Sequence, residues 1–148
     1  MLRISKLTDY AVLVMVELTN SPGEVLSAQA LAERCGLETP TVSKVLKLLG
    51  RADLVRSYRG PSGGYEAGKR PEQVSIAEVI IAMEGPIAMT ECSVHEGLCT
   101  VEDHCSARDN WQKVSRAVAL ALENISLADM SRPPQAPPVN GLEIATLA

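Results

Sequence analysis

The stretch that decides the fold is SAQALAERCGLETPTVSKVLKLL, residues 27–49. Ser27 is a favourable N-cap, because its side chain can accept a hydrogen bond from a free N–H of the helix that follows. That helix is expected to stop before Gly36, which makes a tight turn. Thr39 is a second N-cap, with Pro40 at the first helical position, where a missing N–H is harmless. Two short helices joined by a glycine turn predict a helix-turn-helix.

A hairpin pattern follows this pair of helices. Residues 54–58 favour a strand, residues 59–64 (RGPSGG) a turn, and residues 65–67 a returning strand. Before the pair, residues 5–20 carry apolar side chains at helical spacing. The order helix, helix, helix, hairpin predicts a winged helix-turn-helix domain over residues 1–70.

The rest of the chain is predicted to be helical around one loop. Residues 71–87 hold a connecting helix, and residues 88–106 lack periodicity and are expected to form a loop. Residues 107–130 predict a long helix, and the Pro-rich residues 131–148 a disordered tail. The predicted fold class is therefore mainly α with a small β-hairpin.

The long helix carries one apolar stripe at helical spacing: Trp111, Val114, Val118, Leu122 and Ile125. Packing within one chain could account for this stripe. A long apolar helix at the end of a small domain, however, often pairs with a second copy. We therefore expect a dimerisation helix and a homodimer.

Charge is distributed unevenly along the chain. The net charge is −4, yet residues 39–70 hold seven Lys or Arg and only two Asp or Glu. Such a local basic stretch is what a phosphate backbone attracts. The N-terminus lacks a signal-peptide pattern, and no segment reaches the roughly 18 apolar residues of a membrane span. We expect a cytoplasmic protein that binds double-stranded DNA, with no membrane and no small-molecule substrate as a partner.

The helix after Gly36 is expected to enter the major groove of DNA, as the second helix of such pairs does. Its outward side chains can meet phosphates or base edges, and an arginine on the glycine-rich wing can reach the minor groove. A solvated polar face is the simpler alternative, but the caps, turn and wing occur in the order of the DNA-binding motif. The candidate contacts are Thr39, Thr41, Ser43, Lys44 and Lys47 on the helix, with Arg56, Tyr58 and Arg59 on the wing.

Three cysteines mark the loop, in the pattern Cys92-x6-Cys99-x5-Cys105. They lack the paired C-x2-C knuckles of zinc ribbons. Their wide spacing suits an iron–sulfur cluster, 2Fe–2S or 4Fe–4S, which favours thiolates and accepts nitrogen or oxygen at one position. Buried thiols, a redox pair or a zinc site are the alternatives. Candidate fourth ligands are His95, His104, Glu91, Asp103 or a side chain of a partner subunit.

Two further features narrow the function. Cys35 lies near the turn of the helix pair and is expected to be a small core residue. The chain has no phosphate loop, no nucleophile elbow and no acid–base pair of useful spacing. We therefore expect no enzymatic activity.

The residues resemble a known family, the iron–sulfur regulators of the IscR and NsrR type. The resemblance rests on LTDYA at residues 7–11, VRSYRGPSGGY at residues 55–65 and the three-cysteine loop, and covers about residues 1–130. Residues 83–111 look most like regulators of SUF-type iron–sulfur assembly operons. The resemblance implies a homodimeric regulator that binds a pseudo-palindromic operator and senses the state of its cluster. We expect it to repress cluster assembly genes. A cluster-free regulator that uses the cysteines as a thiol redox or zinc sensor is the alternative.

The chain departs from this family at two positions. A histidine ligand of IscR is replaced by Arg108, which cannot ligate, whereas Asp9 matches the NsrR-type carboxylate that reaches the cluster from the other subunit. The resemblance therefore implies Cys92, Cys99, Cys105 and the partner's Asp9 as cluster ligands. Ser43 stands where IscR has a glutamate, so the DNA sequence preference is not carried over, while Arg59 keeps the role of the wing arginine.

Overall fold

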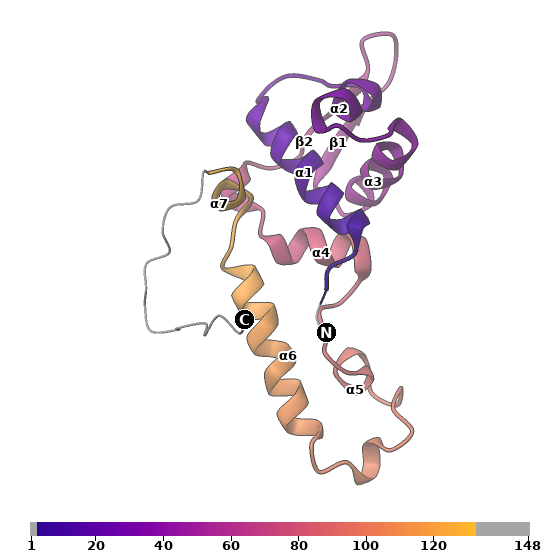
Figure 1. Ribbon diagram of the computed structural model, residues 1–148, viewed down its shortest axis with the longest axis vertical. Coiled ribbons are helices and arrows are strands. Elements are labelled where there is room, and N and C mark those ends of the chain that lie inside the picture. The colour runs from indigo at the N-terminus through magenta and orange to yellow at the C-terminus, as the bar shows by residue number, and fades with distance from the viewer. Residues whose placement is uncertain (1–2, 133–148) are drawn as a thin grey trace, which may run out of the picture.

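The computed structural model describes residues 3–132 and shows a helical protein with one small hairpin (Figure 1). The predicted fold class, mainly α with a two-stranded hairpin, is confirmed. The elements in chain order are α1 (Lys6–Asn20), α2 (Ala28–Cys35), α3 (Thr39–Arg51), β1 (Val55–Tyr58), β2 (Gly64–Ala67), the 3-10 helix η1 (Pro71–Gln73), α4 (Ile76–Glu84), α5 (Glu91–Val94), the 3-10 helix η2 (Glu102–His104), α6 (Arg108–Glu123) and α7 (Leu127–Ser131).

The helix pair forms as the turn chemistry predicts, with one exception. The Ser27 hydroxyl accepts a hydrogen bond from Ala30 N–H at 3.1 Å, and Gly36 closes α2 in the left-handed region at φ 67°. The assignment of Thr39 as an N-cap is wrong. Thr39 is already helical, and Glu38 takes the extended N-cap conformation without a side-chain hydrogen bond. Pro40 in the first turn suffices to start α3 there.

The wing is a hairpin held against the helix pair. β1 and β2 are antiparallel, with Tyr58 opposite Gly64. Leu26 extends this sheet, because its N–H donates to Tyr65 O at 2.9 Å and its O accepts from Tyr65 N–H at 2.7 Å. A Cβ on Gly64 would lie 2.5 Å from the carbonyl oxygen of Leu26, so only glycine allows this approach.

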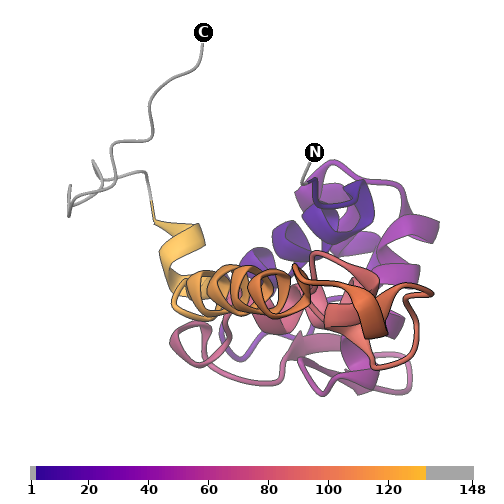
Figure 2. The ribbon, with the colours of Figure 1, turned by 90° about the horizontal axis from the view of Figure 1, so that it is seen from below.

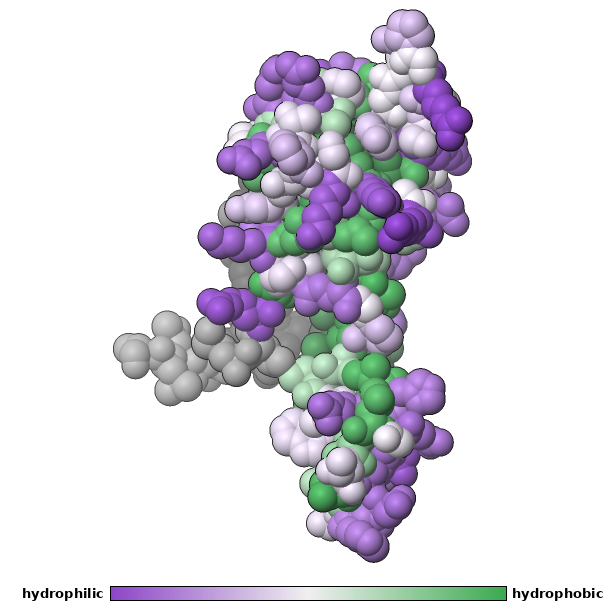
Figure 3. All heavy atoms as spheres, turned by 90° about the vertical axis from the view of Figure 1, so that its right-hand side faces the viewer, coloured by the Kyte–Doolittle hydropathy of each residue, from purple (hydrophilic) through white to green (hydrophobic). Residues whose placement is uncertain are grey.

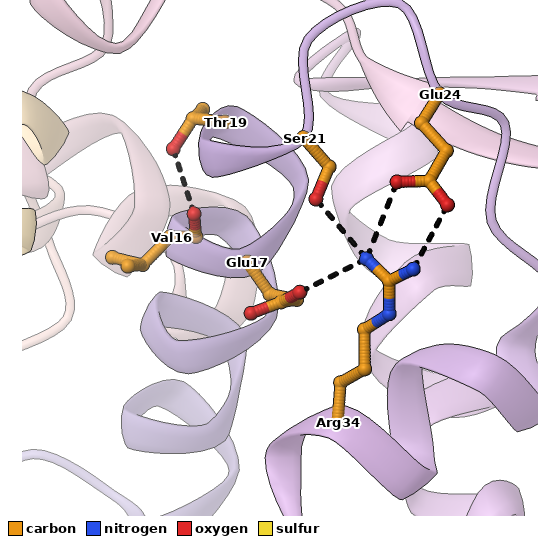
Figure 4. Close-up of polar contacts among 6 residues, drawn as sticks. All are labelled: Val16, Glu17, Thr19, Ser21, Glu24 and Arg34. Atoms are coloured by element: carbon orange, nitrogen blue, oxygen red, sulfur yellow. Dashed lines mark hydrogen bonds and ion pairs between the residues drawn. The ribbon is translucent and has the colours of Figure 1, made fainter.

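One arginine joins α1, α2 and the loop between them (Figure 4). Arg34 donates from Nη2 to Glu24 at 2.8 Å, and from Nη1 to Glu17 and Ser21, both at 3.2 Å. The hydrogen bonds that Arg34 donates, to Glu24 first and then to Glu17, raise the pKa of Arg34. The contacts are exposed, so they fix the geometry of the turn more than they add stability.

The core lies between α1, α2, α3 and α4 and is built from aliphatic side chains. Four residues of α3, at helical spacing, are buried in it: Val42, Val45, Leu46 and Leu49. The core includes Ala11, Val14, Met15, Leu18, Leu31, Val42, Val45, Leu46, Leu49, Leu54, Val74, Val79 and Leu127. This packing leaves the opposite faces of α3 and the wing in solvent.

The long helix predicted over residues 107–130 is instead two helices. α6 ends at Glu123, and Ser126 starts α7 with a capping box, because its hydroxyl accepts from Asp129 N–H while the Asp129 carboxylate accepts from Ser126 N–H. The break lets Leu127 turn into the core, where it is fully buried. α7 therefore returns to α1 and η1 and completes the core of the winged-helix domain.

α6 leads away from this domain, and α5 and η2 lie at its far end (Figures 1 and 2). Residues 88–106, expected to form a loop, also contain the short helices α5 and η2. The disordered tail expected from residue 131 falls outside the described residues, except that α7 extends to Ser131. Among the described helices, none is both long and apolar enough to cross a membrane.

Candidate nucleic-acid interface and cysteine lobe

The outer face of α3 presents small hydroxyls and lysines. Thr39, Ser43, Lys44 and Lys47 are exposed, and Thr41 is half-buried. Their neighbours Val42 and Val45 are fully buried, so the helix has one apolar and one polar face. This amphipathic arrangement lets α3 lie in a groove of DNA while its other side stays in the core.

The wing presents its basic side chains beside α3. Arg59, at the turn between β1 and β2, is exposed, and Tyr58 is 45% exposed. Arg56 differs, because Glu66 lies directly opposite it in the hairpin and their charged atoms are 3.9 Å apart. Glu66 therefore offsets part of the charge that Arg56 would offer to a phosphate, whereas Arg59 has no ion pair within residues 3–132.

A groove between α3 and the wing adds a residue that the sequence analysis missed. Arg51, the last residue of α3, is exposed and lines this groove together with Ser43, Lys47 and Ser57. Arg51 belongs to the basic stretch 39–70, but it lies just beyond residues 27–49, from which the helix pair was predicted. The extra half-turn brings a third cation onto the same face.

The second candidate site is the cysteine lobe, which we define as residues 88–108. Cys92 lies on α5 and is buried, while Cys99 and Cys105 are half-buried, and all three are free thiols. The Cys92 sulfur is 3.2 Å from the Thr90 hydroxyl. α5 packs on α6, and Met89 N–H donates to the buried Ser115 hydroxyl at 3.0 Å. The cysteine lobe is thus attached to α6.

Two cysteines and an ion pair interleave along the chain: Cys99, Glu102, Cys105 and Arg108 follow one another at three-residue intervals. Glu102 N–H donates to Cys99 O at 3.2 Å, Cys105 N–H to Glu102 O at 3.2 Å, and Arg108 N–H to Cys105 O at 3.4 Å. The side chains of Glu102 and Arg108 meet at 2.7 Å. The same Glu102 carboxylate accepts from Gly97 N–H at 2.7 Å.

The remaining candidate ligands do not join the cysteines within one chain. Asp9 is exposed in the first turn of α1, and His95 and His104 are exposed in the cysteine lobe, where His95 Nδ1 lies 2.9 Å from Glu96 O. Glu91 and Asp103 are also exposed. Over residues 3–132, no three His, Cys, Asp or Glu side chains converge to hold a metal ion.

The three free thiols of the cysteine lobe have the donor chemistry of an iron–sulfur cluster site. Within one chain, the described side chains converge on no single point where a metal ion would sit. Cys35 stands apart on α2, where burial raises the pKa of its thiol and so disfavours the thiolate.

A recognition helix with a polar outer face, followed by a basic wing, defines a winged-helix DNA-binding protein. The chain belongs to the Rrf2 family, described as iron-dependent transcriptional regulators, whose profile matches residues 4–133. It is therefore a DNA-binding transcriptional regulator and not an enzyme.

Relatives with known names agree with this assignment. The chain is 31% identical to the HTH-type transcriptional regulator IscR of Sodalis glossinidius over 131 residues, 87% of this chain and 78% of the relative. It is 30% identical to IscR of Erwinia tasmaniensis over 149 residues, 99% of this chain and 84% of the relative.

Two solved structures share the fold. CymR, the global cysteine regulator of B. subtilis, superposes with a TM-score of 0.71 at 30% identity, covering 88% of this chain and 97% of that one. IscR of T. potens superposes with a TM-score of 0.66 at 28% identity, covering 90% and 93%.

Proposed function

We propose that this regulator represses iron–sulfur cluster assembly genes and that a cluster held by Cys92, Cys99 and Cys105 sets its affinity for DNA. The observation that carries the proposal is three free thiols gathered on one lobe that α6 joins to the winged-helix domain. The description of the family as iron-dependent regulators supports the proposal that the chain binds iron. The relatives named IscR support the proposal that the iron is held in a cluster. The repressor role and the target genes rest on the resemblance to regulators of SUF-type operons.

α6 provides the mechanical connection between the lobe and the DNA-binding face. Its 16 residues span about 24 Å at 1.5 Å per residue. At the lobe it meets α5, and at its other end Ile76 N–H donates to Ile125 O at 2.8 Å and Leu127 N–H to Val74 O at 2.9 Å. Because both ends are attached, a rearrangement of the lobe moves α6 relative to the domain that carries α3.

DNA binding is proposed to use two copies of the chain. A dimer places two recognition helices about 34 Å apart, which matches successive major grooves of a pseudo-palindromic operator. Part of the α6 stripe packs within the chain, because Leu122 contacts the core and Val118 is half-buried. Trp111 and Val114 remain 44% exposed, and Ile125 39%. These three would be covered by the second copy.

The same face carries further apolar surface. Figure 3 shows hydrophobic residues gathered where the winged-helix domain meets the lower part of the molecule. A hollow there is lined by Ile4, Ile80, Ile87, Val118 and Leu122. Apolar surface of this kind favours burial against a partner, and it continues the exposed part of the α6 stripe.

Asp9 is proposed as the fourth ligand, from the partner subunit. It is exposed on α1 and, within the described part of one chain, has no ion pair or side-chain hydrogen bond to satisfy it. A carboxylate at the start of α1 also favours the helix dipole, which is its simpler role. If Asp9 of one subunit ligates the cluster of the other, gain or loss of the cluster changes the arrangement of the two subunits.

The test is cluster content in single cysteine variants. We expect Cys92→Ala, Cys99→Ala and Cys105→Ala each to lose iron and sulfide after anaerobic reconstitution, while Cys35→Ala keeps them, since Cys35 lies on α2. Iron and sulfide assays on the same samples measure this. Normal content in any of the three lobe variants would contradict the ligand assignment.

A thiol sensor without a cluster is the second candidate, and one comparison favours it. The B. subtilis neighbour, named a cysteine regulator, has a higher TM-score than the T. potens IscR. In this case oxidation of Cys99 and Cys105, both half-buried, would change DNA affinity in a metal-free protein. A DNA affinity that responds to a thiol oxidant in fully metal-free protein would support this candidate.

A further inference from the structure

Arg108, in the cysteine lobe, forms ion pairs with two carboxylates. Arg108 is the first residue of α6, where a cation is disfavoured by the positive end of the helix dipole. Its Nη2 nevertheless lies 2.7 Å from Glu102 and 3.2 Å from Glu96. These two carboxylates offset the dipole and hold the guanidinium inside the lobe.

Glu102 makes this contact unusual. It is the only buried carboxylate among residues 3–132, at 9% exposed. A buried carboxylate needs both a cation and hydrogen-bond donors, which Arg108 and Gly97 N–H supply. Glu102 therefore connects Gly97, which precedes Cys99, to Arg108, which follows Cys105.

The guanidinium also has an unused donor. Arg108 Nε is the one buried side-chain nitrogen or oxygen without a hydrogen-bond partner in the described part of the chain. A buried donor left free is costly and rare, so it calls for an acceptor that arrives later. Thiolate and sulfide are such acceptors, and hydrogen bonds to sulfur help set the reduction potential of a cluster.

We infer that Arg108 is a positioning residue for the cluster site, which closes the loop of Cys99 and Cys105 through Glu102 and reserves its Nε–H for cluster sulfur. This inference rests on the proposed function. It assigns two separable roles to one side chain: Nη2 shapes the metal-free lobe, and Nε acts only when the cluster is bound.

The first role is tested in metal-free protein, where the proposed function is not involved. Rates of iodoacetamide alkylation at Cys99 and Cys105, read by mass spectrometry, report opening of the lobe. We expect Glu102→Gln and Arg108→Gln to raise these rates about tenfold. Arg108→Gln leaves the buried Glu102 carboxylate without its cation, and Glu102→Gln leaves Arg108 with only its longer ion pair to the exposed Glu96. Arg108→Lys should keep the alkylation rates at the wild-type level, because the lysine ammonium can pair with both Glu102 and Glu96. Arg116→Gln, an exposed site farther along α6, is the matched control.

The second role is tested in reconstituted protein. Arg108→Lys keeps the charge but has no Nε, so we expect a normal cluster content with a more negative reduction potential and an altered visible circular dichroism spectrum. Arg116→Gln should leave both unchanged. Wild-type alkylation rates in both Glu102→Gln and Arg108→Gln would overturn the first role. A reduction potential in Arg108→Lys equal to that of the wild type would overturn the second role. A wild-type chain that takes up no iron and sulfide would instead refute the proposed function, while the alkylation rates still decide the first role.

Discussion

At the residue scale, the wing and the recognition helix differ in how free their cations are. Arg56 faces Glu66 across the hairpin, whereas Arg59 at the turn has no ion pair among the described residues. Phosphate contacts depend on net positive charge that can replace counterions. Arg59 should therefore contribute more to DNA affinity than Arg56.

Arg59→Ala is expected to weaken binding to a mixed-sequence DNA duplex about tenfold and to lower the salt slope by about one. Arg56→Ala should do less. Fluorescence anisotropy over a range of salt concentrations measures both quantities. Arg116→Ala on α6 is the control, and an Arg59→Ala slope equal to that of the wild type would contradict the assignment.

A carboxylate at the end of α4 makes stability depend on pH. Glu84 accepts hydrogen bonds from the Thr8 hydroxyl and from Ser5 N–H, and these bonds, that of Thr8 first, lower the pKa of Glu84. A lowered folded-state pKa contributes stability that is present above the unfolded pKa and is lost as pH falls through the folded one.

We expect Glu84→Gln to flatten the loss of stability as the pH falls from about 5 to about 3, because the substituted side chain no longer titrates. Urea unfolding at several pH values measures this. Glu123→Gln, at the exposed end of α6, should keep the wild-type profile. A Glu84→Gln profile that is as steep as the wild type would show that the hydrogen bonds of Glu84 do not matter.

At the element scale, the return of the chain after α6 is what holds the lobe to the domain. Ile125 and Leu127 both bond to the segment around α4, but only Leu127 is buried. Because a buried leucine loses both transfer energy and packing, α7 should behave as part of the domain core.

Leu127→Ala is expected to lower the free energy of unfolding by about 2–5 kcal/mol. Ile125→Ala, at a site 39% exposed, should cost about 1 kcal/mol or less. Chemical denaturation measures both. Equal effects would mean that α7 is not part of the cooperative core.

How far the sequence predicts these elements depends on whether the signal is local. The cap at Ser27 and the turn at Gly36 follow from neighbouring residues and were predictable. The break before α7 also had a local signal, the Ser126–Asp129 capping box, which the apolar stripe outweighed. The Glu102–Arg108 contact had no local sequence signal, because it depends on how the cysteine lobe folds.

At the scale of the whole molecule, the exposed part of the α6 stripe decides whether two copies pair. Val114 is 44% exposed on the stripe, and Leu120, 47% exposed, lies on the opposite side of the helix. A charge at a buried interface position is costly, whereas a charge in solvent is not.

Val114→Asp is therefore expected to give monomers where the wild type gives dimers, without loss of the fold. Light scattering coupled to size exclusion measures the mass, and circular dichroism checks the helices. Leu120→Asp should leave the dimer intact. A dimeric Val114→Asp protein would remove this face of α6 from the interface.

In the proposed function, the state of the cluster sets DNA affinity through α6. The most direct measurement is DNA affinity, on one anaerobic sample, before and after the cluster is removed, with iron and sulfide assayed in parallel. The promoter of a SUF-type iron–sulfur assembly operon, the target that the proposed function implies, serves as the probe. We predict a difference of about tenfold or more, which needs only about 1.4 kcal/mol of coupling. Equal affinities in the two states would contradict the account.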